Sequence, residues 1–245
     1  MHVFHLCLVF LASGFVGGLI AFVAICCLFV KKDKQYLKDS KFYRFLLKFL
    51  TKVVLWALGV KIHVSGIENI PKEGRFLIAG NHVSNYDPII TWHILKKHKI
   101  AFVSKRSNLE IPFFGRLARR CCFMEIDREN PRNALKTVDT AVDILKDGKL
   151  SVGIYPEGTR SRTGELLPFH NSVFKIAQRA DVPIVVCAVW GTEKIVKRTP
   201  WKPTDVYLNF IETIPADEVK RMRTVEIGER LRKEIEEVIP KTEEK

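Results

Sequence analysis

The stretch RFLIAGNHVSNYDPIITWHILKKHKIAFVS, residues 75–104, decides the fold class. An apolar run of β-forming residues, Arg75–Ala79, is followed by a loop and then by a helical pattern over Pro88–Lys97. A second β-type run, Ile100–Ser104, comes directly after that helix. Strand, helix and strand in this order are typical of a parallel sheet, so the stretch predicts an α/β domain.

The same alternation continues on both sides of this stretch. Five further strands are predicted at Lys61–Ser65, Cys122–Ile126, Leu150–Tyr155, Pro183–Val189 and Val206–Ile211. Further helices are predicted at Pro112–Arg119, Pro131–Lys146, Asn171–Arg179 and Asp217–Val238. We therefore expect a central, largely parallel or mixed sheet of about seven strands flanked by helices. Ligands of such sheets bind in the loops beyond the carboxyl ends of the strands.

The N-terminal segment, residues 1–30, contains no Lys, Arg, Asp or Glu. A continuous helix of this length would be about 45 Å long, at about 1.5 Å per residue. The hydrocarbon core of a bilayer is about 30 Å thick. The segment is therefore predicted to be a retained membrane anchor that either spans with tilt or lies in one leaflet. A cleaved signal peptide fits less well, because no basic residue precedes the apolar run and no small-x-small site follows it.

A basic segment follows the anchor. Its cations are Lys31, Lys32, Lys34, Lys38, Lys41, Arg44, Lys48 and Lys52. Positive charge next to an apolar segment predicts that this side lies on the cytoplasmic face of the plasma (inner) membrane. We therefore treat residues 1–58 as a membrane-anchoring region and residues 59–245 as the α/β domain.

Within the basic segment, residues 41–58 predict an amphipathic helix. Lys41, Arg44, Lys48 and Lys52 recur at steps of three and four, opposite an apolar face. A helix of this kind is suited to anionic lipid headgroups, which we expect as its partners. The alternative is a surface helix that packs its apolar face on the core of the domain.

The net charge of +13 indicates an anionic partner, whether nucleic acid, a phospholipid surface or a phosphorylated substrate. A nucleic-acid binder would interleave basic residues with exposed aromatic ones, whereas many aromatic residues here lie in the anchor and the helix at 41–58. No nucleic-acid partner is therefore expected. The six cysteines show no C-x-x-C and no Cys/His ligand spacing, so no metal site is predicted.

The loop GNHVSNYDP, residues 80–88, follows the first strand of the opening stretch. A carboxylate from Asp87 that holds one nitrogen of His82 would fix the tautomer of the imidazole. The other nitrogen could then take a proton from a hydroxyl group. The alternative is structural, because Asp87 before Pro88 can begin a helix and His82 can be a packed loop residue.

Three other groups of charged residues follow predicted strands. Lys105 closes the strand Ile100–Ser104, and Arg128 follows the strand Cys122–Ile126. The turn YPEGTRS, residues 155–161, comes after a third strand. The planar fork of Arg160 can bind a phosphate through two hydrogen bonds, which a lysine cannot do. Ordinary surface charge is the alternative for each of these groups.

Taken in order, these motifs resemble a known family. N-H-x-S-x-x-D, then K…P-F-F-G…I-D-R, then P-E-G-T-R-S and finally V-P-I-V resemble the 1-acylglycerol-3-phosphate acyltransferases of glycerolipid synthesis. The resemblance covers residues 60–210 approximately. It implies a fatty acyl transfer to the free 2-hydroxyl of 1-acylglycerol 3-phosphate, which gives phosphatidic acid.

The resemblance also implies roles for single residues. His82 would be the general base and Asp87 its orienting partner. The glycerol phosphate would be held by Lys105, Glu157, Gly158, Thr159 and Arg160, with Arg128 as a further phosphate candidate. No G-x-S-x-G elbow is present, so the hydroxyl is expected to attack an acyl carrier protein or coenzyme A thioester directly, without a covalent acyl-enzyme. No cofactor is expected.

Departures from the family pattern leave the substrate preference open. Cys121 or Cys122 stands where the family often has glycine, and residues 169–172 read FHNS in place of a common F-K-x-G. The last motif, residues 182–186, lacks the usual second proline. Glycerol 3-phosphate or another lysophospholipid is therefore an alternative acceptor. A membrane-tethered nucleic-acid binder and a structural membrane module are the alternatives outside enzymes.

Overall fold

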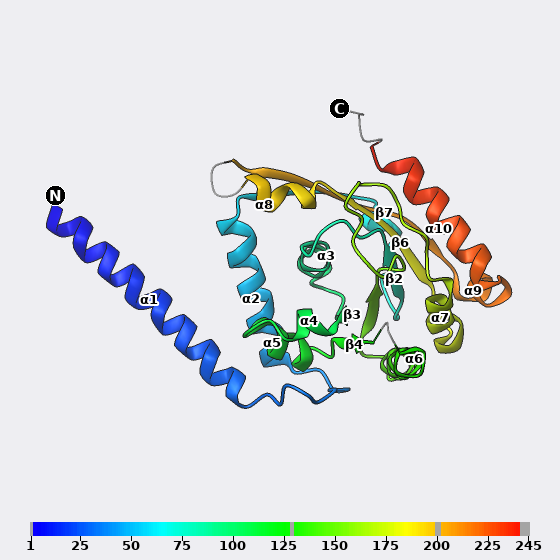
Figure 1. Ribbon diagram of the computed structural model, residues 1–245, viewed down its shortest axis with the longest axis horizontal. Coiled ribbons are helices and arrows are strands. Elements are labelled where there is room, and N and C mark those ends of the chain that lie inside the picture. The colour runs from blue at the N-terminus through cyan, green and yellow to red at the C-terminus, as the bar shows by residue number, and fades with distance from the viewer. Residues whose placement is uncertain (1, 128–129, 199–201, 241–245) are drawn as a thin grey trace.

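A mixed β-sheet runs through the molecule (Figure 1). The computed structural model describes residues 2–127, 130–198 and 202–240. Its strands are β1 (Val60–Ser65), β2 (Leu77–Gly80), β3 (Ile100–Lys105), β4 (Met124–Ile126), β5 (Ser151–Ile154), β6 (Ile184–Trp190) and β7 (Thr204–Ile214). The order across the seven-stranded sheet is β1-β7-β6-β2-β5-β3-β4, and neighbours pair in parallel except β6 with β7. The predicted α/β class with a mixed sheet is confirmed.

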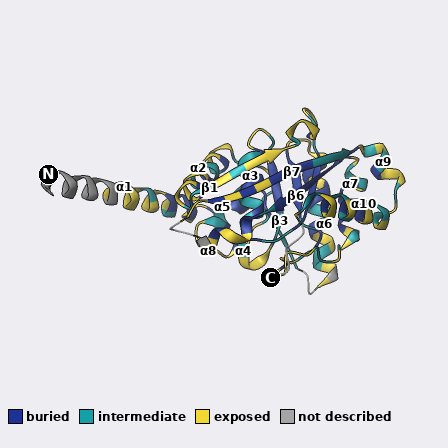
Figure 2. Cartoon of the chain, turned by 90° about the horizontal axis from the view of Figure 1, so that it is seen from above, coloured by how far each residue is buried: buried dark blue, intermediate teal, exposed yellow. Residues whose placement is uncertain are grey.

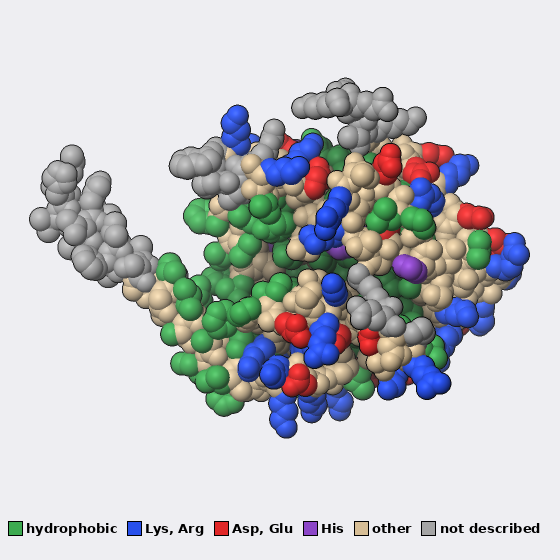
Figure 3. All heavy atoms as spheres, viewed as in Figure 1, with side chains coloured by type: hydrophobic (Ala, Val, Ile, Leu, Met, Phe, Trp, Pro, Cys, Tyr) green, Lys and Arg blue, Asp and Glu red, His purple; other side chains and the backbone are tan. Residues whose placement is uncertain are grey.

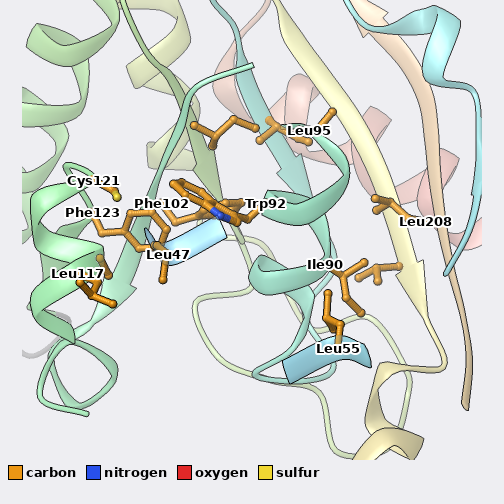
Figure 4. Close-up of a cluster of buried hydrophobic side chains, with 14 of the residues drawn as sticks. Leu47, Leu55, Ile90, Trp92, Leu95, Phe102, Leu117, Cys121, Phe123 and Leu208 are labelled. Carbon is orange, nitrogen blue, oxygen red and sulfur yellow. The ribbon is translucent and has the colours of Figure 1, made fainter. Parts of the chain in front are cut away.

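Helices cover both faces of this sheet (Figures 1 and 2). They are α1 (His2–Leu28), α2 (Lys41–Ala57), α3 (Asp87–Ile94), α4 (Arg106–Leu109), α5 (Phe114–Arg120), α6 (Pro131–Lys146), α7 (Lys175–Ala180), α8 (Ile195–Arg198), α9 (Ala216–Arg221) and α10 (Thr224–Val238). Helices α2, α3 and α5 share one buried cluster with the sheet, and α6, α7, α9 and α10 share the other. In Figure 4, which shows the first cluster, Leu47 of α2 lies beside Trp92 of α3 and Phe102 of β3.

The central strands are the most enclosed part of the sheet. Every residue of β2 and β5 is buried, as expected for parallel strands with helices on both faces. In contrast, β7 alternates near its start between buried Val206 and Leu208 and exposed Tyr207. The loop that follows β2 therefore begins in the middle of the molecule, with supporting structure on both sides.

Helix α1 projects from the body of the molecule, and its C-terminal turns pack on the domain (Figures 1 and 2). Val23, Cys26 and Cys27 are buried there. Arg116 of α5 donates from Nη1 to the carbonyl oxygens of Cys27 (2.8 Å) and Val30 (3.1 Å), which fixes the end of the helix. Within the described residues, no helix combines the length and the apolarity that crossing a bilayer requires. The anchoring role of residues 1–30 stays a prediction.

Helix α2 packs on the domain through a side that carries Arg44. This residue is only 4% exposed. Its guanidinium group donates to the carboxylate of Asp39 (2.8 Å) and to the carbonyl oxygens of Ile100 (3.1 Å) and Cys121 (3.3 Å), and lies 4.6 Å from the ring of Trp92. The prediction that Arg44 belongs to an exposed basic stripe is wrong, because these acceptors and the aromatic face compensate for burying the cation.

The exposed side of α2 carries large apolar side chains together with two of the predicted cations, Lys41 and Lys52. Five of the exposed apolar side chains recur at steps of three and four and form one stripe, which we call the α2 aromatic stripe: Phe42, Phe45, Phe49, Val53 and Trp56. Lys48, predicted to face lipid headgroups, donates to the carbonyl oxygen of Lys96 (2.5 Å). The predicted helix is present at Lys41–Ala57, but aromatic side chains dominate the face that it exposes.

The predicted helix at Asp217–Val238 is interrupted. Met222 and Arg223 both have extended backbones with ψ near 148°, so the segment divides into α9 and α10. The carboxylate of Glu226 accepts a hydrogen bond from the backbone N–H of Arg223 (2.8 Å) and begins the second helix. The sequence pattern also gives no indication of the short helix α8.

Candidate active site

The carboxyl ends of four neighbouring strands bring polar loop residues together. Strands β6, β2, β5 and β3 run parallel, so their carboxyl ends share one edge of the sheet. His82 follows β2, Glu157 follows β5, Thr192 follows β6, and Lys105 ends β3. Because β2 lies between β6 and β5, the loop of His82 has a supporting loop on each side. Figure 3 shows histidine side chains near the centre of one face, with Lys and Arg side chains around them.

His82 and Asp87 form a hydrogen-bonded pair. The distance from His82 Nδ1 to Asp87 Oδ2 is 2.7 Å, and the Asp87 side chain has no exposed area. The same Oδ2 accepts from the backbone N–H groups of Val83 and Ser84, both at 2.8 Å. Since backbone N–H groups can only donate, Asp87 is an acceptor here and the imidazole donates from Nδ1. The Nε2 atom of His82 is then left as an acceptor, on a side chain that is 14% exposed.

The structural alternative for Asp87 does not hold. Helix α3 begins at Asp87, but no side chain caps its N-terminus. The carboxylate instead turns back onto the loop that precedes the helix, where it orients the ring of His82. The predicted pairing of these two residues is therefore present in the structure.

Thr192 completes the environment of Asp87, and the sequence interpretation missed it. Its Oγ1 donates to Asp87 Oδ1 at 2.5 Å, across a separation of 105 residues, and Thr192 is fully buried. Three donors meet Asp87 Oδ2 and one meets Oδ1, and together these four hydrogen bonds fix the orientation of the carboxylate. The sequence signal was a hydroxyl residue two positions after a buried strand, following Gly191, whose φ is +85°. That signal alone does not identify its partner.

Asn81 and Tyr155 support His82 from two sides. The Asn81 amide donates to the carbonyl oxygen of Val189 and accepts from its N–H, both at 2.8 Å, which ties the His82 loop to β6. The ring of Tyr155 stacks on the imidazole, with centroids 4.5 Å apart and planes 19° apart, and Phe102 stacks behind it. Burial raises the pKa of the Tyr155 hydroxyl well above its ordinary value, so this ring is neutral support.

Glu157 lies behind the His82 loop and does not face the substrate side. Its Oε1 accepts from the backbone N–H of His82 (2.6 Å), and its Oε2 accepts from the N–H of Leu167 (3.0 Å). Burial raises the pKa of this carboxyl group, while the two backbone hydrogen bonds lower it. The expectation that Glu157 holds the glycerol phosphate is corrected, because both oxygens are engaged inside the protein and a carboxylate repels a phosphate. Glu157 is a positioning residue for His82.

The turn after Glu157 needs a glycine. Gly158 has a φ of +68°, and a Cβ atom at this position would lie 2.8 Å from the ring of His170. Gly158 therefore shapes the turn and offers no side chain to a ligand. Three residues later, Ser161 donates its N–H to the carbonyl oxygen of His82 (2.8 Å), so the turn runs alongside the His82 loop.

The remaining predicted ligands are exposed cations and a hydroxyl. Thr159 and Arg160 are exposed and directly precede the residue that is bonded to the His82 backbone. Lys105 is exposed at the end of β3, and β5 separates β3 from β2. Lys105 and Arg160 thus lie at the same edge of the sheet as His82. Arg128 lies outside the described residues.

This arrangement has a definite chemical capacity. A neutral imidazole that is held through Nδ1 can accept a proton at Nε2 from a hydroxyl group. The buried carboxylate of Asp87 then stabilises the resulting imidazolium ion. Exposed cations at the same edge can hold an anionic group of the molecule that carries the hydroxyl.

Comparison with known proteins places the chain. Residues 61–190 match the protein family described as Acyltransferase. The chain belongs to this acyltransferase family. Over 147 residues it is 31% identical to the 1-acyl-sn-glycerol-3-phosphate acyltransferase of Borreliella burgdorferi, covering 60% of this chain and 58% of that relative. Over 138 residues it is 36% identical to the protein of the same name from Escherichia coli, covering 56% of each chain.

A plant relative gives a similar result. The chain is 29% identical over 168 residues to the 1-acyl-sn-glycerol-3-phosphate acyltransferase of Limnanthes douglasii, covering 68% of this chain and 59% of that relative. The matched regions of these relatives thus span less than two thirds of their length.

The fold has a counterpart among crystal structures. The 1-acyl-sn-glycerophosphate (LPA) acyltransferase of Thermotoga maritima matches with a TM-score of 0.63 and 24% sequence identity. The match covers 93% of this chain and 91% of that one. The chain therefore shares its overall fold with that protein.

Proposed function

We propose that this acyltransferase moves a fatty acyl group from a thioester to the free 2-hydroxyl of 1-acylglycerol 3-phosphate, giving phosphatidic acid. The observation that carries the proposal is the His82–Asp87 pair, whose Nε2 atom is left as an acceptor on a partly exposed ring. The relatives named above, each called a 1-acyl-sn-glycerol-3-phosphate acyltransferase, support this choice of acceptor.

In this mechanism His82 is the general base. Its Nε2 takes the proton of the 2-hydroxyl as the hydroxyl oxygen attacks the thioester carbonyl carbon, forming a tetrahedral oxyanion. The C–S bond then breaks, and the leaving thiolate receives the proton from the imidazolium ion. Asp87 stays ionised throughout and holds the ring in place. No acyl-enzyme forms, because the base acts directly on the acceptor.

The phosphate of the acceptor is held by cations at the same edge of the sheet. Arg160 supplies a planar fork and Lys105 a point charge, and both side chains are exposed. A phosphomonoester carries about −1.5 to −2 charges near neutral pH, so two cations match its charge. Thr159 can add a neutral hydrogen bond, and Arg128 stays a further candidate from the end of β4.

The enzyme is proposed to work at a membrane surface, on the cytoplasmic face of the plasma (inner) membrane. Its acceptor lysolipid resides in a bilayer, and residues 1–30 carry no ionisable Lys, Arg, Asp or Glu side chain. The exposed α2 aromatic stripe lies next to α1, because the rings of Phe22 and Phe42 pack edge to face with their centroids 6.4 Å apart. Together these apolar surfaces support anchoring by α1 with α2 lying in the interface.

The first test replaces the base. We expect His82→Ala to reduce acyl transfer by about 10²–10⁴-fold or more, because a general base contributes that much to rate. His82 is a loop residue whose ring is partly exposed, so the thermal midpoint should change little. The measurement is transfer from acyl-carrier-protein and coenzyme A thioesters to lysophosphatidic acid, glycerol 3-phosphate and larger lysophospholipids.

The control for this test is His170→Ala, which removes an exposed histidine beside the same turn. This variant should retain most of the activity. Transfer by His82→Ala within about threefold of the parent would contradict the mechanism, since a base is worth far more than that. Faster transfer to glycerol 3-phosphate than to lysophosphatidic acid would leave the mechanism in place and change the acceptor.

A further inference from the structure

A cavity of about 590 Å³ lies between the C-terminal end of α1 and the segment that contains α4 and α5. None of the residues that line it follows β2, β5 or β6, so the His82 loop and the Glu157 turn do not contribute to it. Its nearest link to the proposed acceptor site is Arg106, which directly follows Lys105 at the end of β3. Four of the residues around it are cations: Lys32, Arg106, Arg116 and Arg119.

One of these cations, Arg119, is buried and has a hydrogen-bond donor without an acceptor among the described residues. Arg119 is 6% exposed, and its Nη2 donates to Glu125 Oε2 at 2.7 Å. Its Nε–H is also buried and has no acceptor within the described part of the chain. Burying a charged group normally requires that its donors are satisfied, since an unmet donor costs free energy. The Nε atom itself has almost no accessible surface, so an anionic oxygen in the cavity reaches it only when neighbouring side chains move.

The other cations stand at the rim or the wall. Arg116 is fixed by its hydrogen bonds to the end of α1, while Lys32 and Arg106 are exposed. The carboxylates that line the cavity are Asp33 and Glu110, and Glu110 is already paired with Arg106 at 2.9 Å. With Glu125 included, four cations face three carboxylates, so the surroundings favour an anion. Lys31 and Lys34 add to this charge in the shallower hollow next to the cavity.

The remaining wall of the cavity is apolar and continues onto α1. Leu28, Ile111 and Phe113 line it and are also exposed on the surface. Phe29, which is 79% exposed, directly follows Leu28. An occupant of this cavity therefore meets cations on one side and, on the other, the apolar surface that we assign to the bilayer. That combination is suited to an amphiphile with an anionic head.

We propose that this cavity binds the phosphate of an anionic bilayer phospholipid, with the headgroup held by Arg119 and Arg106 and the acyl chains along α1. The inference rests on the membrane attachment proposed above. It adds an electrostatic contact outside the predicted basic stripe of α2, where Arg44 is buried and Lys48 donates to a backbone carbonyl, while Lys41 and Lys52 are exposed. It places the contact at the end of the apolar helix, where headgroups of a bilayer would lie.

The test compares two double variants of the full chain. Lys32→Gln with Arg106→Gln removes two exposed charges from the cavity rim. The matched control, Lys220→Gln with Lys233→Gln, removes two exposed charges from α9 and α10, on the opposite side of the molecule from α1 (Figures 1 and 2). Binding is measured by co-sedimentation with phosphatidylcholine vesicles that do or do not contain phosphatidylglycerol.

We expect the rim variant to bind phosphatidylglycerol vesicles about 10- to 30-fold more weakly than the parent, as for two basic residues at a membrane surface. The control should lose less than about threefold, because its charges are far from the surface. Binding to pure phosphatidylcholine should be equal for all three proteins. A third variant, Arg119→Lys, keeps the charge but lacks the spare Nε–H, and it should lose part of the preference for the anionic vesicles.

Three outcomes would overturn the proposal. Equal losses in the rim variant and in the control would show that only overall charge matters. A raised KM for lysophosphatidic acid in neutral detergent micelles would make the cavity part of the acceptor site. A changed acyl-chain preference without a change in vesicle binding would assign the cavity to an acyl chain. Failure of the proposed function is distinguishable, because an inactive parent protein can still show the lipid preference.

Discussion

Asp87 depends on donors from two distant parts of the chain. The local loop provides His82, Val83 and Ser84, whereas Thr192 arrives from the far end of β6. Leaving a buried carboxylate oxygen without a donor costs free energy. It also leaves the carboxylate group free to rotate. The orientation of the His82 imidazole, our proposed general base, is therefore set by single atoms, and small substitutions at these positions should have large effects.

Replacing Thr192 tests this dependence. Thr192→Val keeps the shape but leaves Asp87 Oδ1 without a donor, which costs about 1.5–3 kcal/mol for a charged acceptor. We expect kcat to fall about 10- to 100-fold and the pH–rate profile to shift, while the acceptor KM stays nearly constant. Thr192→Ser restores the hydroxyl and should recover most of the rate. Equal losses in the two variants would show that the methyl group is what matters.

Replacing Arg160 tests the phosphate assignment. Arg160→Lys keeps the charge but loses the bidentate fork, so the acceptor KM should rise about tenfold at a similar kcat. Arg162→Lys, an exposed neighbour in the same turn, is the control. Steady-state kinetics with acceptor and donor varied separately provide the measurement. A change confined to the acyl donor's KM would assign Arg160 to the donor instead.

The contacts that the sequence predicts join residues close together in the chain, whereas the contacts that it misses join distant ones. His82 and Asp87 are five residues apart, so their pairing is a local property of one loop. The burial of Glu157 and the contact of Thr192 depend on which strands flank β2, and spacing along the chain does not give that order. Glu157 was therefore correctly predicted to lie beside the His82 loop, but its side chain points into the protein and not toward a ligand. Thr192 was missed.

At the scale of elements, periodicity predicted α2 well but did not predict which side of it is buried. Arg44 faces inward because Asp39, Trp92 and two carbonyl groups happen to surround it. Similarly, the pattern over residues 217–238 has no proline, so the break between α9 and α10 is not visible in it. Tertiary contacts decided both outcomes.

Helix α10 is joined to β7 and α9 through Arg230. Its guanidinium group contacts Glu212 (2.7 Å), Glu218 (2.6 Å) and Glu234 (3.1 Å). Three carboxylates around one cation leave an excess of negative charge. Burial, together with a hydrogen bond to Glu212, raises the pKa of Glu234 to about 7. The carboxyl group of Glu234 therefore holds a proton in the folded protein at a pH where it would lose it in the unfolded chain.

The pH dependence of stability follows from this pKa. A folded pKa above the unfolded value means that the contribution of Glu234 is fully present below about pH 4.5 and is lost as the pH rises through about 7. We expect the thermal midpoint of the parent to fall across that window. Glu234→Gln, which cannot ionise, should fall less, and Glu229→Gln on the exposed side of α10 should behave like the parent. Parallel curves for all three proteins would contradict the assignment.

At the scale of the whole molecule, exposed apolar side chains are gathered on one side. In Figure 3 they lie mainly over α1 and α2, while Lys and Arg side chains dominate elsewhere. A soluble surface rarely exposes so large an apolar area, so this side is the one that we assign to the bilayer.

Replacing two members of the α2 aromatic stripe tests that assignment. Phe45→Ser with Trp56→Ser should weaken binding to neutral phosphatidylcholine vesicles at least about tenfold, since each large apolar side chain contributes about 1.5–3 kcal/mol on burial. The loss should persist at high salt, which does not weaken apolar burial. The control is Val225→Ser, which replaces an exposed apolar side chain on α10. Undiminished binding of the double variant would leave α1 as the sole apolar contact.

The order of strands in the sheet also affects when the chain can fold during its synthesis. In the sheet, β2 lies between β5 and β6, and β1 pairs with β7, so the earliest strands bond to the latest ones. During synthesis the His82 loop leaves the ribosome 105 residues before the threonine that fixes its aspartate. Such long-range pairing slows folding, because distant segments must meet before either is stabilised. The contacts that fix Asp87 therefore form only after most of the chain has been made.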